Sequence, residues 1–304
     1  MISVIICSAS VNVLELVSKN ISSTIGVPHE IIAFDNSHEQ RGICEIYNQG
    51  VREAKFDILC FMHEDVAILT SGWGKKVIDI FVKDGEIGVV GVAGGGYKAL
   101  TPSGWYCVEF QNPKKSFQNI LQGYKLDSKD EIHAYHNPDD EKLSEVVCVD
   151  GVWFCTKKEI AKSNPFDEVL LKKFHGYDVD FCLRVYAKHK IVVTYDILMK
   201  HASEGNFNKV WLDQILILHQ KWSKRLPMTT ADVSEKEIYL TEKRALKNLI
   251  EQMLKWEYSF MDINRMLLST AASSRMSIRL FFKGYIHFLE KLFAKRNSAN
   301  ELAP

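Results

Sequence analysis

The sequence lacks an excess of either charge. Its 38 lysines and arginines balance 38 aspartates and glutamates, so the formal net charge at pH 7 is zero. No global field therefore draws the chain to nucleic acid, and we expect no nucleic-acid partner. The balance hides a local asymmetry, because the chain is basic from Arg275 onward while the candidate catalytic residues before it are acidic.

Signals for cysteine pairing are also missing. The seven cysteines are scattered, their number is odd, and no CxxC pair occurs. Four of them lie in apolar, strand-like runs, where free cysteine behaves as a small hydrophobe: Cys7, Cys60, Cys148 and Cys155. We therefore expect no disulfide framework and a reducing, cytoplasmic compartment.

Long apolar runs are absent as well. No run approaches the roughly 20 residues that a helix needs to span a bilayer. The N-terminal segment MISVIICSAS lacks the basic region of a signal peptide and soon reaches polar residues. These features predict a soluble cytoplasmic protein, or one that is peripheral at the inner face of the membrane.

Short β-rich runs alternate with helical patterns over the first 100 residues. The strand-like runs cover residues 3–7, 29–34, 57–62 and 88–92, and the helical patterns cover 11–21, 45–54 and 73–81. Nearly continuous apolar strands separated by helices predict an α/β fold with a mostly parallel sheet flanked by helices. Ligands of such sheets bind beyond the carboxyl ends of the strands. Three polar clusters fall there: Ser8, residues 35–37, and His63-Glu64-Asp65.

The rest of the chain changes pattern twice. Residues 94–145 contain three consecutive glycines and several prolines, which predicts loops or an irregular insert beside the site. The sheet is expected to resume at residues 145–149. From Asn208 onward the pattern is helical, with helices expected at 210–222, 234–258 and 277–294.

The tripeptide His63-Glu64-Asp65 is the strongest local signal for chemistry. A carboxylate at a strand end can hold a divalent ion that bridges the phosphates of a nucleoside diphosphate, and Mg²⁺ or Mn²⁺ suits such oxygen ligands. The ion would neutralise charge that develops on a leaving diphosphate. The tripeptide alone is equally compatible with polar residues that close a strand at a turn.

A second signal lies in the segment that runs from His175 to Arg184. Asp178 and Asp180 precede an apolar helical pattern. Asp178 at the start of a helix would be stabilised there as an N-cap, since aspartate is a preferred cap. It could equally act as a general base that takes a proton from an acceptor hydroxyl. Composition does not separate these interpretations.

His201 follows the last strand-like segment. A lone histidine is more often structural than a metal ligand, but this one falls on the same predicted rim as the two acidic clusters.

Together these segments resemble the family 2 glycosyltransferases, which have the GT-A fold. The resemblance covers about residues 1–205, and its blocks occur in the family's order and spacing. The matching blocks are residues 4–7 with 31–37, residues 47–54 (YNQGVREA), residues 63–65 at the family's Asp-x-Asp position, and residues 148–154 with 176–184.

The resemblance implies a donor side for the site. Ser8 and Asp35 would contact the nucleotide base and its ribose, with Arg41 and Asn48 near the nucleotide. Glu64 would also belong to donor binding. The implied donor is a nucleoside diphosphate sugar, a UDP-sugar first among them.

The resemblance also implies the catalytic groups. Asp65 and His201 would hold the divalent cation, Mn²⁺ or Mg²⁺, and Asp178 would be the catalytic base. Asp150 and Asp180 would lie on the side of the transferred sugar and the acceptor. The implied reaction is one in-line displacement with inversion at the anomeric carbon.

One position departs from the family pattern. His63 stands where the first aspartate of Asp-x-Asp is usual, so this position supplies no carboxylate and the metal depends on Asp65, with Glu64 beside it. The expected organisation is a GT-A catalytic domain over residues 1–205 and a helical C-terminal extension over 206–304. The nucleotide-sugar half of the domain would cover about residues 1–100, and the acceptor half about 145–205.

The first functional hypothesis is an inverting glycosyltransferase for polysaccharide or glycoconjugate synthesis, with a sugar or lipid-linked sugar as acceptor. A sugar nucleotidyltransferase is disfavoured because residues 7–10 (CSAS) do not form its Gly-rich phosphate loop. A third hypothesis is a non-catalytic protein that binds a sugar nucleotide or acts as a scaffold. Its only support is the histidine at position 63.

The C-terminal segment 278–296 is strongly apolar with basic residues between. A membrane-surface helix is one interpretation. A helix buried against its neighbours or in a homo-oligomer is the favoured one, because apolar helical stripes are commonly core.

Overall fold

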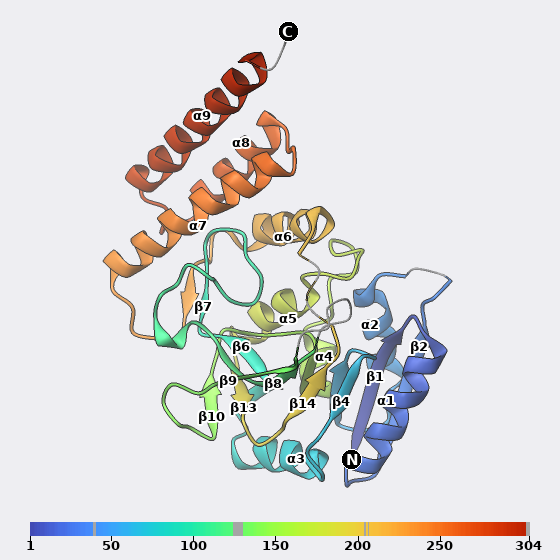
Figure 1. Ribbon diagram of the computed structural model, residues 1–304. Coiled ribbons are helices and arrows are strands. Elements are labelled where there is room, and N and C mark those ends of the chain that lie inside the picture. Colours follow the sequence, from blue (N-terminus) through green and yellow to red (C-terminus); the bar gives the residue numbers. More distant parts are fainter. Residues whose placement is uncertain (39–40, 124–129, 204, 206, 302–304) are drawn as a thin grey trace.

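The computed structural model describes residues 1–38, 41–123, 130–203, 205 and 207–301 (Figure 1). Within these residues, seven strands form the main sheet. In spatial order they are β10 (Leu143–Glu145), β13 (Lys190–Thr194), β5 (Ile87–Gly91), β12 (Trp153–Lys157), β3 (Ile58–Met62), β1 (Ile2–Ser8) and β2 (His29–Asp35).

The main sheet is mixed rather than mostly parallel. β1 pairs in parallel with β2 and β3, and β5 pairs in parallel with β13, but β12 runs antiparallel between β3 and β5. A parallel neighbour needs a crossover that returns the chain to the starting edge. β12 has none, because it enters where β3 ends, with Trp153 opposite Met62.

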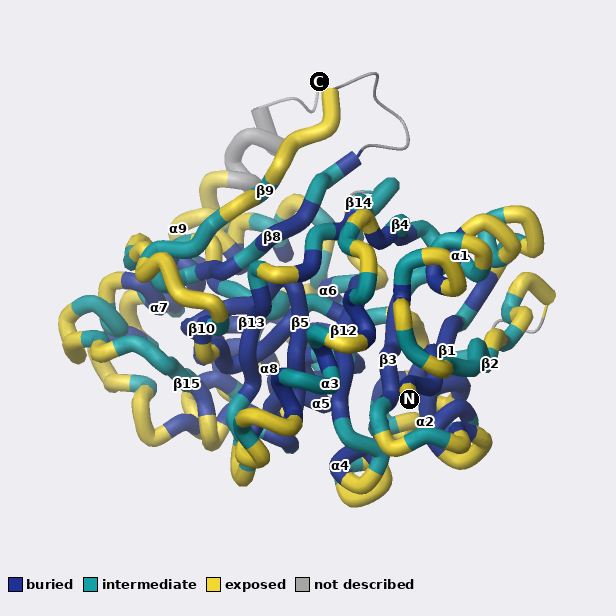
Figure 2. Tube along the Cα trace, turned by 90° about the horizontal axis from the view of Figure 1, so that it is seen from below, coloured by how far each residue is buried: buried dark blue, intermediate teal, exposed yellow. Residues whose placement is uncertain are grey.

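Helices cover both faces of this sheet. Along β1 the buried side chains alternate, as strand geometry requires. Val4 and Ile6 pack with α1 (Val11–Thr24) and α3 (Trp73–Lys83), whereas Ile5 packs on the other face. That second face is covered by α2 (Ile43–Glu53), α4 (Lys158–Ser163) and α5 (Tyr177–Val185). Figure 2 shows β13, β5, β12 and β3, the strands in the middle of this sheet, as mostly buried.

A second sheet occupies much of the segment for which loops were expected. Its order is β11 (Cys148–Val149), β6 (Ala93–Gly95), β8 (Phe117–Gln122), β14 (Met199–His201) and β4 (Val66–Ile68), with β9 (Ile132–His136) paired to β8. A 3₁₀ turn, η1 (Pro113–Lys115), precedes β8. These strands are short and pair mostly across long stretches of sequence, so local periodicity does not reveal them.

The C-terminal part is helical, as the sequence predicts, and contains one helix more than expected. Its elements are α6 (Lys209–Trp222), β15 (Met228–Thr229), α7 (Glu235–Lys255), α8 (Phe260–Ala271) and α9 (Ile278–Glu301). α6 contributes Ile215 and Leu218 to the core of the main sheet and Leu212 to a separate core with α7, α8 and α9. These last three helices stack at one end of the molecule (Figure 1). Within the described part of the chain, no helix has the length and apolarity to cross a bilayer.

A buried polar network joins the C-terminal helices to β7 (Tyr97–Lys98) and the loop after it. The Glu242 carboxylate on α7 accepts hydrogen bonds from Tyr97 Oη (2.6 Å), Leu100 N (2.9 Å) and both Thr101 N and Oγ1 (2.9 and 2.8 Å). All these groups are buried, so the carboxylate satisfies donors that water cannot reach. These hydrogen bonds fasten α7 to β7 and to the loop that follows it.

Candidate active site and metal site

Two strand ends from distant parts of the sequence meet at the carboxyl edge of β3. Residues 63–65 form the connection between β3 and β4, and β14 pairs antiparallel with β4, with His201 opposite Val66. The Asp65 carbonyl accepts a hydrogen bond from Ala202 N (3.0 Å). This pairing places His201 Nε2 3.6 Å from Asp65 Oδ1.

His63, Asp65 and His201 together form a group that could hold a metal ion. One ligand atom from each lies within 4.8 Å of the others, and the two imidazole rings are 5.9 Å apart between centroids. Two ring nitrogens and a carboxylate oxygen suit a first-row divalent transition ion. His63, which the sequence left without a role, is therefore part of the group. The signal for it is the i, i+2 spacing from Asp65.

The surroundings of His63 decide which ring nitrogen is available. Tyr177 Oη donates its single hydrogen to the Gly151 carbonyl (3.0 Å), so at 3.0 Å from His63 Nε2 it acts as an acceptor. Nε2 therefore carries the hydrogen and Nδ1 carries the lone pair. Burial, followed by the neighbouring His201, lowers the pKa of His63 to about 4, so the ring is neutral at pH 7.

Gly151 makes the Tyr177 contact possible. A Cβ atom at this position would overlap the Tyr177 hydroxyl. The glycine thus belongs to the support of the site, although it contributes only its backbone. Sequence reasoning attached no role to Tyr177, because its partners lie 26 and 114 residues away in the chain.

Asp65 has a second neighbour that the sequence did not indicate. Ser203 Oγ donates to Asp65 Oδ2 (2.6 Å) and lies 3.3 Å from His201 Nε2. The serine thus orients the carboxylate beside the two imidazoles, as outer partners of metal ligands commonly do.

Ser8 and Glu64 join the ends of β1 and β3. The Glu64 carboxylate accepts hydrogen bonds from Ser8 Oγ (2.6 Å), Ala9 N (3.2 Å) and Ser10 N (3.3 Å). Ser10 is the N-cap of α1, so the carboxylate lies at the positive end of that helix. Asp35 is the register partner of Ser8 on β2, and hydrogen bonds from Ser37 lower its pKa. Ser8, Asp35 and Glu64 therefore share one rim.

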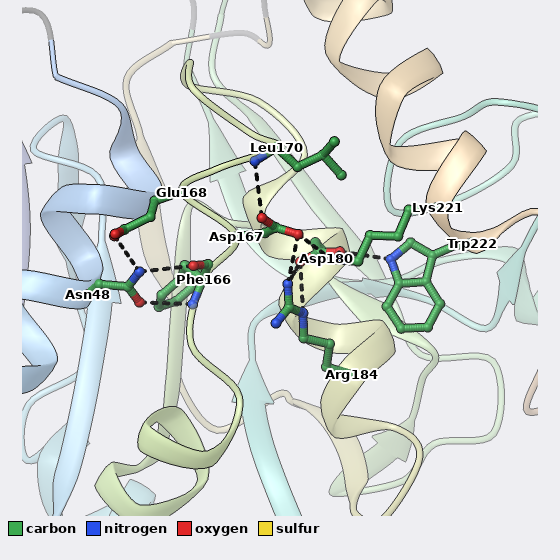
Figure 3. A network of polar contacts seen from close by, with 9 residues as sticks. All are labelled: Asn48, Phe166, Asp167, Glu168, Leu170, Asp180, Arg184, Lys221 and Trp222. Atoms are coloured by element: carbon green, nitrogen blue, oxygen red, sulfur yellow. Dashed lines mark hydrogen bonds and ion pairs between the residues drawn. The ribbon is translucent and has the colours of Figure 1, made fainter.

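Arg41 and Asn48 make contacts within or beside α2. Arg41 donates to Glu45 (2.8 Å) and to Gln49 (2.7 Å). The Asn48 amide is held by the Phe166 backbone: its Nδ2 donates to Phe166 O and its Oδ1 accepts from Phe166 N, both at 2.9 Å (Figure 3). Its Nδ2 also donates to Glu168 (2.8 Å). Both polar ends of Asn48 therefore fasten the 166–168 loop to α2.

Asp178 lies in the first turn of α5, and the N-cap is Gly176. The interpretation of Asp178 as the N-cap is therefore wrong. Its Oδ2 accepts a hydrogen bond from Gly151 N (3.0 Å). Burial, and next the charge of Asp150, raise the pKa of Asp178 to about 7, in the range that suits a general base. Asp150 accepts a hydrogen bond from Val152 N (2.9 Å).

Asp180 is separated from this group, because residues two apart on a helix point in nearly opposite directions. Its buried carboxylate accepts hydrogen bonds from Arg184 Nε (3.0 Å) and Trp222 Nε1 (2.8 Å) and pairs with Lys221 (2.6 Å). Asp167 pairs with the same arginine and lysine (Figure 3). This network ties α5 to α6, and the structure does not bring Asp180 to the metal group.

Sequence comparison decides the family. A protein-family model described as "Glycosyltransferase like family" matches residues 3–232. The chain belongs to this family. No curated protein matches it in sequence.

Solved glycosyltransferases share the fold at low identity. GalNAc-T7, solved with UDP, GalNAc and Mn²⁺, is 11% identical, with a TM-score of 0.50 over 90% of this chain and 55% of that one. TarS of S. aureus is 10% identical, with a TM-score of 0.51 over 95% of this chain and 53% of that one. Its fragment 1-349, solved with UDP-GlcNAc, has the same identity and TM-score and is covered to 88%.

These likenesses confirm the α/β fold of GT-A type that the sequence predicts, with a mixed sheet. The chain spans about half the length of the GalNAc-T7 and TarS chains. The expected resemblance to glycosyltransferases is likewise confirmed by the family match.

Proposed function

We propose that this glycosyltransferase transfers a sugar from a nucleoside diphosphate sugar to a hydroxyl acceptor, with a divalent cation held by His63, Asp65 and His201. The observation that carries the proposal is the convergence of these three side chains beyond the end of β3 in a chain of this family. The cation would neutralise charge on the departing diphosphate.

The residues fit a metal ion through their donor set. Tyr177 occupies Nε2 of the neutral His63 ring, so Nδ1 would be its ligand atom, and Ser203 orients the Asp65 carboxylate. Imidazole nitrogen suits transition ions and carboxylate oxygen suits Mg²⁺ and Mn²⁺ alike, so we expect Mn²⁺ to be preferred to Mg²⁺. The possible ligand role of His63 argues against the non-catalytic alternative, since a histidine at position 63 would then supply a ligand atom to the metal group.

The donor side of the proposed site is the rim formed by Ser8, Asp35 and Glu64. Ser8 and Asp35 lie side by side at adjacent strand ends, where nucleotides bind in open α/β sheets. GalNAc-T7 and TarS were solved with UDP and with UDP-GlcNAc, which favours a UDP-sugar for this chain as well. Arg41 and Asn48 would act near the nucleotide by holding α2 and the 166–168 loop.

The acceptor side of the proposed site centres on Asp178. We assign it as the base that takes the acceptor proton as the hydroxyl attacks, which implies inversion at the anomeric carbon. Asp150, which influences the Asp178 pKa, would face the transferred sugar. Asp180 would hold α5 against α6 in place of contacting the acceptor.

We also propose that the catalytic domain ends near residue 205 and that residues 206–304 form a helical extension. A role in polysaccharide or glycoconjugate synthesis is likewise part of the proposal. Buried contacts of α6 and Glu242 argue that the helices after residue 205 support the catalytic half.

A donor screen tests the proposal. Purified protein is heated with UDP-, GDP- and TDP-sugars in the presence of Mn²⁺ or Mg²⁺, and donor hydrolysis is followed in parallel. A ligand that binds the folded state raises the melting temperature by mass action. Asp65→Ala should abolish the metal-dependent shift. Asp57→Ala is the matched control. Asp57 is an exposed carboxylate that directly precedes β3, whereas the metal group follows the other end of this strand. No shift with any donor would overturn the assignment.

A further inference from the structure

Helix α9 has two apolar faces on opposite sides. Its inner face packs into the C-terminal core through Leu280 and Phe288, which are buried. Gly284 lies on the same face, where a Cβ atom would collide with Leu246 of α7. The inner face of α9 therefore packs against neighbouring helices, as the favoured interpretation of the sequence predicts.

The outer face carries four large apolar side chains that remain exposed. Ile278, Phe282, Ile286 and Phe293 are 77%, 56%, 51% and 58% exposed. At 100° per residue they fall within an arc of about 80°, roughly opposite the inner face, and they span about 22 Å along the helix. A stripe of this length is more than the scattered apolar residues of an ordinary surface.

Basic residues accompany the stripe. Arg279 and Lys283 are exposed along one flank of it. The segment 275–301 contains six lysines and arginines and two glutamates, a net charge of +4, although the whole chain has a net charge of zero. An excess of positive charge thus lies in the segment that carries the apolar stripe.

We propose that the outer face of α9 binds the surface of an anionic lipid bilayer, with the helix lying in the interface plane. Exposed apolar residues would enter the acyl boundary while the lysines and arginines meet lipid phosphates. A second copy of this chain is a poorer occupant, because a two-fold contact through α9 would bring two segments of net charge +4 together.

Vesicle co-sedimentation of the full chain tests this surface. Vesicles of phosphatidylcholine alone are compared with vesicles that also contain phosphatidylglycerol, at low and high salt. We expect binding to the anionic vesicles only, weakened by salt. The double change Arg279→Gln and Lys283→Gln should weaken binding about 30-fold, because each lost cation should weaken it about fivefold and the two factors multiply.

Phe282→Ser should weaken binding about tenfold, since it removes one large side chain from the apolar stripe. Val82→Ser is the matched control: Val82 is 77% exposed on α3, away from α9, and its loss should leave binding unchanged. Melting temperatures show that each variant folds.

Three results would overturn the proposal. The first is no binding to either vesicle at low salt. The second is equal binding to both vesicles without salt dependence, which excludes an anionic surface as the partner. The third is a concentration-dependent dimer in light scattering that Phe282→Ser abolishes, which assigns the stripe to a contact between copies.

Discussion

Tyr177→Phe isolates the hydrogen bond that fixes the His63 ring. The substitution keeps the aromatic ring and its edge contact with Tyr47 (5.4 Å between centroids). It removes the hydroxyl that donates to the Gly151 carbonyl and accepts from His63 Nε2, each at 3.0 Å. The buried Gly151 carbonyl and the half-buried His63 Nε2 then lose this partner, and the imidazole can adopt either tautomer.

Two effects of different size follow. Outer partners of metal-binding histidines contribute 10- to 100-fold in metal affinity, so we expect Mn²⁺ to bind Tyr177→Phe weaker by about that factor. Leaving the buried Gly151 carbonyl unpaired should lower the free energy of unfolding by about 1–3 kcal/mol. The affinity is measured by calorimetric titration with Mn²⁺ in the presence of UDP, and the stability by urea unfolding.

Tyr47→Phe is the matched control. Tyr47 is fully buried beside Tyr177, and within the described residues its hydroxyl makes no hydrogen bond to His63 or to Gly151. Its removal should leave Mn²⁺ affinity unchanged. Unaltered Mn²⁺ affinity in Tyr177→Phe would refute the tautomer argument, and an equal loss in both variants would point to general disturbance of the core.

Three further predictions concern other parts of the molecule. Asp178→Asn should retain donor binding and lose transfer by about 10²- to 10⁴-fold, and intact transfer would remove Asp178 as the base. Because the pKa of Asp178 is raised to about 7, its ionised, proton-accepting form increases with pH, so kcat/KM should rise through about pH 7; a flat profile would contradict the assignment. Glu242→Ala leaves four buried donors without their acceptor and should cost about 3–5 kcal/mol in urea unfolding, whereas Glu290→Ala at an exposed position should cost little.

The polar residues of the rim were predictable from sequence, because short apolar strands and their ends are local features. β1, β2 and β3 lie within about two residues of the predicted runs, and Ser8, Asp35 and Asp65 lie at or just beyond their carboxyl ends. Parallel pairing of these three strands then brings the ends to one edge.

By itself, the sequence determined the α/β class, the family resemblance and the helical C-terminal part, since these depend on periodicity and on the order of motifs. Only the tertiary structure showed that His63 lies beside His201, because the two residues are far apart in the sequence and meet through the pairing of β14 with β4. It also decided that Asp180 points away from Asp178, into a network with α6. For α9, the sequence showed an apolar helix, and the packing of α7 and α8 determined which of its two faces is left exposed.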